Sequence, residues 1–190
     1  MESEHGDILV SSDRLIVRRP EESDIAILQR VFGDPEMMRT LGETWTPEMV
    51  ADTVKEWRDE WGYKNRWSGV LVRKGDSEVI GTAGLSEDTV LDEPGLEMSW
   101  FVLSEHQGQG FAAEITVALL RFAFEHVGAE RVIGETHPEN RASTRVLEKS
   151  GFTFKGRCQH AYDFLPGFDT QSLWVYSRAM WWRGSKFSRP

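Results

Sequence analysis

The stretch HQGQGFAAE, residues 106–114, contains several small residues and lies directly before a predicted helix. Gly108, Gly110, Ala112 and Ala113 leave the backbone accessible, so that successive amide N–H groups can point together at an anion. The helix that follows would add the positive end of its dipole at the same place. The stretch therefore predicts a loop that holds a phosphate or diphosphate group.

Three explanations compete for this loop. Residues 108–113 match the dinucleotide fingerprint G-x-G-x-x-A, with Glu135 as the acidic residue downstream. That fingerprint should begin almost directly after its strand, whereas residues 104–107 intervene here and only 80 residues remain after Gly110. A nucleoside-triphosphate loop needs G-x-x-x-x-G-K followed by Ser or Thr, and the stretch has no lysine. The third explanation is a turn whose glycines simply let a strand lead into a helix.

Two further motifs narrow the choice of ligand. Gln107, Gly110 and Ala112 form the pattern Gln-x-x-Gly-x-Ala, and Asn140 and Ser143 stand three residues apart in NRAS, before LEKSGF closes a helix. With LEMSWFVLSEHQGQGFAAE, NRAS and LEKSGF in this order, the chain resembles the GNAT superfamily of N-acetyltransferases. Within it, the chain is most similar to the RimJ/RimL-like branch of ribosomal-protein N-terminal acetyltransferases. The resemblance extends from about Arg14 to Tyr176.

The resemblance implies a binding site for acetyl-CoA. The backbone of residues 107–112 would hold the diphosphate, and the strand through Phe101 and Val102 would pair with the pantetheine arm. Asn140 would contact that arm, and Arg145 would reach toward the nucleotide end. The expected cofactor-binding residues are Phe101, Val102, Gln107, Gly108, Gln109, Gly110, Phe111, Ala112, Asn140, Ser143 and Arg145.

The same resemblance implies direct attack of an amine on the thioester. The amine must first lose a proton. Glu97 is the first candidate for the base, because it lies on the strand that should border the thioester. The alternative is that Glu97 is an ordinary strand residue that faces solvent. His137 is a second candidate for the base. Ser143 occupies the family's Asn-x-x-Ser position, so we expect it to protonate the leaving thiolate. The alternative is that Ser143 is an ordinary serine in the first turn of a helix that Asn140 caps. Tyr162 and Tyr176 are further candidates for the acid.

The acceptor pocket should be built by two helices near the N-terminus and by the loop HAYDFLPGFDTQ. Tyr162, Asp163 and Phe164 of that loop could hold a cationic amine by cation–π and charge contacts. Trp45, Trp57 and Trp61 are interpreted as core residues. The sequence does not choose between a peptide N-terminus and a small-molecule amine as acceptor. A non-catalytic module that senses acyl-CoA is the alternative function.

The order of predicted elements fits a single α/β (α+β) domain with the acyl-CoA N-acyltransferase fold. The predicted sheet is mixed, mostly antiparallel and twisted, has about seven strands and carries helices on both faces. Residues 1–10 are predicted as a flexible tail and residues 11–185 as the domain. The predicted strands are 13–20, 67–73, 78–85, 96–103, 131–136, 152–158 and 172–180. The predicted helices are 21–33, 46–62, 111–128 and 139–151.

Composition excludes several function classes. The net charge of −9 argues against broad nucleic-acid binding, which needs clustered Lys and Arg. No apolar stretch is long enough to span a membrane, and the acidic start MESEHGD is unlike a signal peptide, so we expect a cytoplasmic protein. The single cysteine, Cys158, rules out an internal disulfide and a metal site built from several cysteines, and we expect no metal. Relatives often form homodimers, but the sequence leaves the oligomeric state open.

Overall fold

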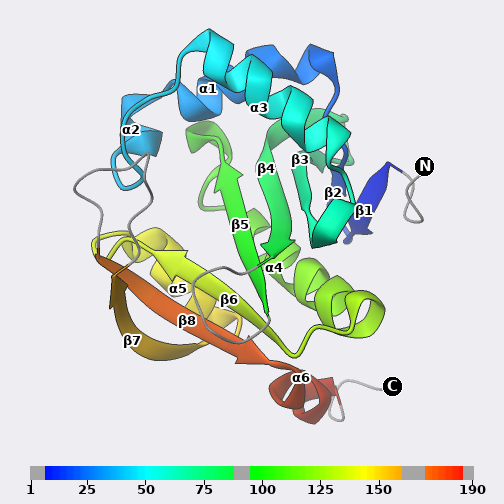
Figure 1. Cartoon of the computed structure of the whole chain (residues 1–190), viewed down its shortest axis with the longest axis vertical. Coiled ribbons are helices and arrows are strands. Elements are labelled where there is room, and N and C mark those ends of the chain that lie inside the picture. The colour runs from blue at the N-terminus through cyan, green and yellow to red at the C-terminus, as the bar shows by residue number, and fades with distance from the viewer. Residues whose placement is uncertain (1–6, 88–94, 160–169, 186–190) are drawn as a thin grey trace.

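A single eight-stranded sheet runs through the computed structural model, which describes residues 7–87, 95–159 and 170–185 (Figure 1). Its strand order is β1-β2-β3-β4-β5-β6-β8-β7. The strands are β1 Ile8–Ser11, β2 Leu15–Arg18, β3 Trp67–Arg73, β4 Glu78–Glu87, β5 Leu96–Val102, β6 Arg131–Thr136, β7 Thr153–Gln159 and β8 Thr170–Ser177. Every neighbouring pair is antiparallel except β5 and β6, which are parallel, so the predicted mixed and mostly antiparallel sheet is confirmed.

The predicted boundaries at the two ends of the domain differ most from the structure. The sheet has eight strands rather than about seven, because residues 8–10, predicted as part of the tail, belong to β1 and pair with β2. The last predicted strand, 172–180, ends at Ser177, and residues 178–180 begin a helix. The sequence pattern missed β1 because its neighbouring residues Leu9 and Val10 are both buried beside a register shift, so the strand lacks an alternation of polar and apolar side chains.

Helices cover both faces of the sheet, as predicted. The α-helices are α1 Ile25–Phe32, α2 Pro35–Met38, α3 Pro47–Asp59, α4 Phe111–Arg121, α5 Arg141–Lys149 and α6 Arg178–Ser185. Short 3-10 helices cover Glu22–Asp24, Tyr63–Asn65 and Ser104–His106 (η3), and a π-helical segment, Phe122–Val127, extends α4 to Gly128. The predicted start of α3 is confirmed: the Thr46 side chain accepts a hydrogen bond from the Met49 N–H, and Pro47 follows.

The alternation of side chains along each strand separates two hydrophobic cores. In β3, Trp67 and Leu71 pack into the larger core with α4, whereas Val70 and Val72 pack into a second core with α1 and α3. In β5, Met98 and Trp100 belong to the α4 side, and Phe101 packs against the α1–α3 side. Residues of even and odd number in β5 therefore face different layers, as the predicted strand requires.

The sheet opens between β5 and β6. These parallel strands are paired only at Leu96 with Val132 and at Glu97 with Ile133. Beyond this point β5 stays hydrogen-bonded to β4, and β6 stays hydrogen-bonded to β8. Figure 1 shows the two strands starting side by side and then diverging. The divergence leaves one edge of residues 98–102 unpaired with any described strand.

The position of β5 depends on close contact between β3 and β4. A Cβ atom added to Gly84, which pairs with Ser99 of β5, would lie 2.2 Å from the backbone oxygen of Trp67. Because that oxygen is part of the sheet, we expect Gly84→Ala to lower the free energy of unfolding by about 2 kcal/mol or more in urea titrations. Gly75→Ala is the matched control, since a Cβ there meets no atom within 4 Å. Equal effects of the two changes would contradict this account of the sheet.

Candidate functional site

A cavity of about 910 Å³ begins where β5 and β6 diverge. Its walls come from β5, from the loop before α4 and the first turn of α4, from the end of β6, from α5, and from the α1–α3 region. Of the predicted site residues, Glu97, Phe101, Val102, Gln107, Gly108, Gly110, Phe111, Ala112, Asn140, Ser143 and Arg145 line this cavity. Residues from three separate motifs therefore meet in one space.

Residues 107–110, the predicted phosphate loop, have a left-handed backbone at both glycines. Gly108 and Gly110 adopt φ values of 76° and 81°, a left-handed conformation that side chains disfavour. Gly110 is the N-cap of α4, and no side chain caps this helix. A Cβ atom on Gly108 would meet no atom within 4 Å, so the space above the loop is open. Uncapped N–H groups that face open space fit a phosphate ligand.

Gln107 ties this loop to the end of β5. Its side-chain Nε2 donates a hydrogen bond to the carbonyl oxygen of Val102, at 2.9 Å. The backbone N–H of Gln107 donates to the carbonyl oxygen of Ser104, at 3.2 Å. Both the side chain and the backbone N–H of Gln107 therefore support the loop, and the free donors begin at residue 108. Gln109 does not line the cavity, and its carbonyl oxygen instead accepts a hydrogen bond from Arg14, at 3.2 Å.

The turn between β1 and β2 braces the first turn of α4. Glu114 accepts hydrogen bonds from Ser12 Oγ at 2.7 Å, from the Arg14 backbone N–H at 2.8 Å and from Arg14 Nε at 2.6 Å. Burial by itself would raise the pKa of the Glu114 carboxyl, but these three donors together hold that pKa below its usual value. The sequence gives no signal for this contact, because about 100 residues separate its partners.

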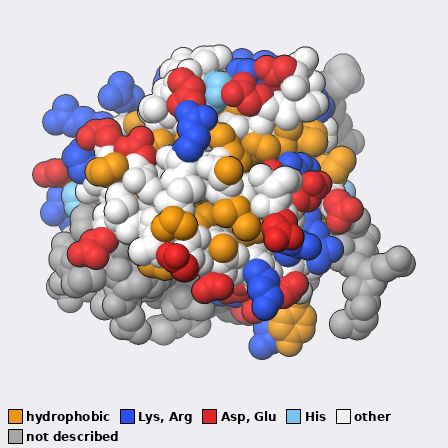
Figure 2. Space-filling model, turned by 90° about the horizontal axis from the view of Figure 1, so that it is seen from above, with side chains coloured by type: hydrophobic (Ala, Val, Ile, Leu, Met, Phe, Trp, Pro, Cys, Tyr) orange, Lys and Arg blue, Asp and Glu red, His pale blue; other side chains and the backbone are white. Residues whose placement is uncertain are grey.

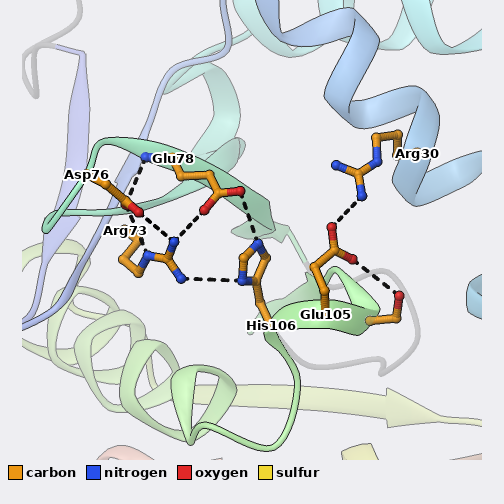
Figure 3. A network of polar contacts seen from close by, with 7 residues as sticks. Arg30, Arg73, Asp76, Glu78, Glu105 and His106 are labelled. Atoms are coloured by element: carbon orange, nitrogen blue, oxygen red, sulfur yellow. Dashed lines mark hydrogen bonds and ion pairs between the residues drawn. The ribbon is translucent and has the colours of Figure 1, made fainter.

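A second polar network involves His106, the residue directly before the loop (Figure 3). Buried His106, in η3, has its Nε2 3.3 Å from Glu78 Oε1 and its Nδ1 3.4 Å from Arg73 Nη1. Arg73 also pairs with Glu78 and Asp76, and its hydrogen bond to Asp76 lowers the pKa of that carboxyl to about 2. The hairpin of β3 and β4 thus holds the residue that precedes the phosphate loop.

Glu97 lies at the inner end of the cavity. It is half-buried on β5 and shares a strand face with Ser99 and Phe101, as predicted. Glu135, on β6, is a second cavity-lining carboxylate on the same face of the sheet, two residues beyond the Ile133 that pairs with Glu97. The sequence pointed to Glu135 only as part of a dinucleotide site. The register of β5 against β6 is what places it near Glu97.

Asn140 and Ser143 lie at the start of α5. The Asn140 Oδ1 accepts a hydrogen bond from the Ser143 backbone N–H at 3.0 Å, so Asn140 is the N-cap. Its Nδ2 donates to Thr40 Oγ1 at 3.3 Å, which links α5 to the segment after α2. Ser143 lines the cavity and is half-buried. The structure therefore fits both explanations of this motif, a helix cap at Asn140 and an acid at Ser143, since the cap leaves Ser143 in the cavity lining.

The other candidate base, His137, lines the cavity, whereas the candidate acid Tyr176 does not. His137 lines the cavity after β6. Tyr176 does not line it: the ring lies between Phe124 and Phe152, with centroids at 5.8 and 5.5 Å, and burial raises the pKa of its hydroxyl. Tyr176 is therefore placed in the core rather than beside a reacting group. Tyr162, Asp163 and Phe164 lie outside the described residues.

An aromatic cluster forms the wall of the cavity nearest α1 and α3. Phe32 stacks on Trp45 with ring centroids 4.3 Å apart, and Trp57 and Phe101 contact Phe32 edge-on. All four residues line the cavity. Trp45 and Trp57 pack against the smaller core as predicted, but each also presents a surface to the cavity. Trp61 is buried in the larger core.

The described residues also limit other kinds of site. Among residues 7–87, 95–159 and 170–185, no group of three or more His, Cys, Asp or Glu side chains could hold a metal ion. Within the same ranges, no helix has the length and apolar character needed to cross a bilayer. On the face shown in Figure 2, Lys and Arg side chains are interspersed with Asp and Glu around apolar side chains.

Comparisons with known proteins agree with this geometry. Residues 14–153 match the Acetyltransferase (GNAT) domain family. A Bacillus licheniformis protein named as an uncharacterized N-acetyltransferase, p20, is 28% identical over 156 residues, covering 76% of this chain and 82% of that protein. A ribosomal-protein-S5-alanine acetyltransferase from Vibrio fischeri has a similar structure, with a TM-score of 0.72 and 18% identity over 90% of this chain and 97% of that one.

A spermidine N-acetyltransferase from Vibrio cholerae, solved with CoA and spermine, also has a TM-score of 0.72, with 15% identity over 89% of this chain and 98% of that one. Identities this low show a shared fold. The match to the GNAT domain is the stronger finding, since it covers most of the chain and includes both the phosphate loop and α5. The chain therefore belongs to the GNAT family of acetyl-CoA-dependent acetyltransferases.

Proposed function

We propose that the protein transfers the acetyl group of acetyl-CoA to a primary amine by direct attack. The observation that carries this proposal is the single continuous cavity. It extends from the open phosphate loop at Gly108 and Gly110 to the carboxylates Glu97 and Glu135. A cofactor held at one end of this space can present its thioester to an amine held at the other end.

The chain offers separate groups for each part of the cofactor. The backbone N–H groups of residues 108–112 and the positive end of α4 hold the diphosphate. The unpaired edge of residues 98–102 offers backbone N–H and C=O groups to the amides of the pantetheine arm, in the way that a neighbouring strand would. Arg145 and Lys149, exposed on α5 and lining the cavity, suit the nucleotide end. These contacts would hold the thioester near Glu97.

Acetyl-CoA supplies an activated acetyl group, and three groups of the chain assist its transfer. Glu97 removes a proton from the incoming ammonium, directly or through water, since only the neutral amine has a lone pair for attack. A backbone N–H on the open edge of β5 stabilises the negative charge that develops on the carbonyl oxygen. The Ser143 hydroxyl donates a proton or a hydrogen bond to the sulfur as the carbon–sulfur bond breaks.

The acceptor end suits a cationic amine. Glu97 and Glu135 supply negative charge, and the wall of Phe32, Trp45 and Trp57 offers aromatic surface for the carbon chain or the charge of the amine. Peptide N-termini and small-molecule amines both fit this description. The solved relatives include a ribosomal-protein acetyltransferase and a spermidine acetyltransferase, which support both classes as candidates.

Cofactor binding tests the first part of the proposal. We expect calorimetry to detect acetyl-CoA binding to the wild-type protein, and Gly110→Val to abolish it, because valine cannot adopt the φ of 81° that orients the loop. Gly128→Val is the matched control, since Gly128 has a φ of 75° and does not line the cavity. If the wild-type protein does not bind acetyl-CoA at millimolar concentration, the proposal is wrong.

Glu97→Gln tests the base. We expect kcat/KM for the amine to fall by about 100-fold or more, and the acidic limb of its pH profile to disappear. Acetyl-CoA binding should be unchanged by calorimetry. The control is Glu87→Gln on the neighbouring strand, whose carboxylate is exposed and does not line the cavity. A rise in KM for the amine with unchanged kcat would assign Glu97 to acceptor binding instead. Absence of thiol release with every amine in a panel would favour the acyl-CoA sensor.

Ser143→Ala tests the acid. We expect kcat to fall by about tenfold, the order expected for one hydrogen bond to a charged group, with little change in the dissociation constant for CoA. Ser143→Thr, which keeps the hydroxyl, should restore most of the rate. Thr144→Ala, one residue further along α5 and outside the cavity lining, controls for effects on the helix. Equal rates for the alanine variant and the wild type would exclude the role of Ser143.

A further inference from the structure

The phosphate loop lacks a cation of its own. Residues 107–113, QGQGFAA, contain neither Lys nor Arg, although the diphosphate of acetyl-CoA carries negative charge. A guanidinium group nevertheless lies against this loop. It belongs to Arg14, in the turn between β1 and β2, and its Nη1 donates to the carbonyl oxygen of Gln109 at 3.2 Å. The cation is therefore brought to the loop by the fold, from 95 residues away in the sequence.

Several contacts fix the orientation of the Arg14 side chain. Its Nε forms an ion pair with Glu114 Oε2 at 2.6 Å, and its Cζ lies 4.6 Å from the centroid of the Phe111 ring. Ser12 donates a hydrogen bond to the other Glu114 oxygen, at 2.7 Å. A guanidinium held at Nε, at Nη1 and over an aromatic face has little freedom to turn, so the direction of its remaining N–H groups is defined.

Arg14 is not one of the residues that line the cavity, but its remaining donors lie beside Gly110, which does line it. Arg14 Nη2 would be 3.7 Å from a Cβ atom placed on Gly110, and the side chain as a whole is 50% exposed. A guanidinium has five N–H donors, and the hydrogen bonds of Arg14 within the described residues use only its Nε and Nη1. A diphosphate held by the amides of residues 108–112 would therefore come within reach of Nη2.

We propose that Arg14 binds the diphosphate of acetyl-CoA through Nη2, and that Glu114 and Ser12 position it for this contact. The inference rests on the proposed cofactor site and adds a binding residue to it from the N-terminal hairpin. Arg14 supplies the donors that the loop lacks, and Glu114 acts as a positioning residue. The hairpin of β1 and β2 is then part of the cofactor site as well as an edge of the sheet.

Truncated cofactors provide a test, because the contact requires the diphosphate alone. Arg14→Gln should weaken the binding of CoA and of 3′-dephospho-CoA by about 10- to 100-fold in calorimetry, the range expected for loss of a hydrogen bond to a charged group. The same variant should leave kcat/KM unchanged with S-acetylpantetheine, which has no diphosphate. Glu114→Gln, which keeps the guanidinium but weakens its orientation, should weaken CoA binding by a smaller factor.

Arg66→Gln is the matched control, since Arg66 is 49% exposed and its side chain, within the described residues, pairs with Glu56 and Glu60 rather than with the phosphate loop. Wild-type affinity of Arg14→Gln for CoA would overturn the inference. An equal loss with CoA, 3′-dephospho-CoA and S-acetylpantetheine would also overturn it, by assigning Arg14 to the folding of the loop. Absence of CoA binding by the wild-type protein would instead contradict the proposed acetyltransferase function. A failure of the Arg14 inference can therefore be distinguished from a failure of the proposed function.

Discussion

The parallel pairing of β5 with β6 ends after Glu97 and Ile133, and the cavity exists because of that early end. Each strand keeps a different antiparallel neighbour, β4 on one side and β8 on the other, and these pairings carry the two strands apart. An open edge in the middle of a sheet leaves backbone N–H and C=O groups that need partners. A ligand with amides along its length is a suitable partner, which is why we propose that the pantetheine arm binds at this opening.

The phosphate loop depends on contacts from two hairpins that are distant in sequence. The turn of β1 and β2 contacts the first turn of α4 through Arg14 and Glu114, and the hairpin of β3 and β4 contacts His106 just before the loop. A glycine-rich segment has large conformational freedom in the unfolded chain, and fixing it costs entropy. The contacts from the two hairpins restrict this freedom, because they hold His106 before the glycines and Gln109 between them.

Much of the fold, and most of the residues that line the cavity beside the glycine loop, could be predicted from the sequence. The mixed sheet, the N-cap of α3 and the two faces of β5 follow from local alternation and capping chemistry. The weaker predictions involve contacts between distant residues. Trp45 and Trp57 were interpreted as core because apolar periodicity identifies a buried face but does not distinguish packed protein from a cavity wall.

The sequence by itself determined the family motifs, the glycines of the phosphate loop and the strand that carries Glu97. These features are local, since backbone conformation and strand faces depend on neighbouring residues. Only the tertiary structure decided that Glu135 shares a sheet face with Glu97, that Tyr176 lies in the core, and that Arg14 reaches the phosphate loop. These relations depend on strand register and on the packing of distant segments, and no spacing along the chain encodes either of them directly.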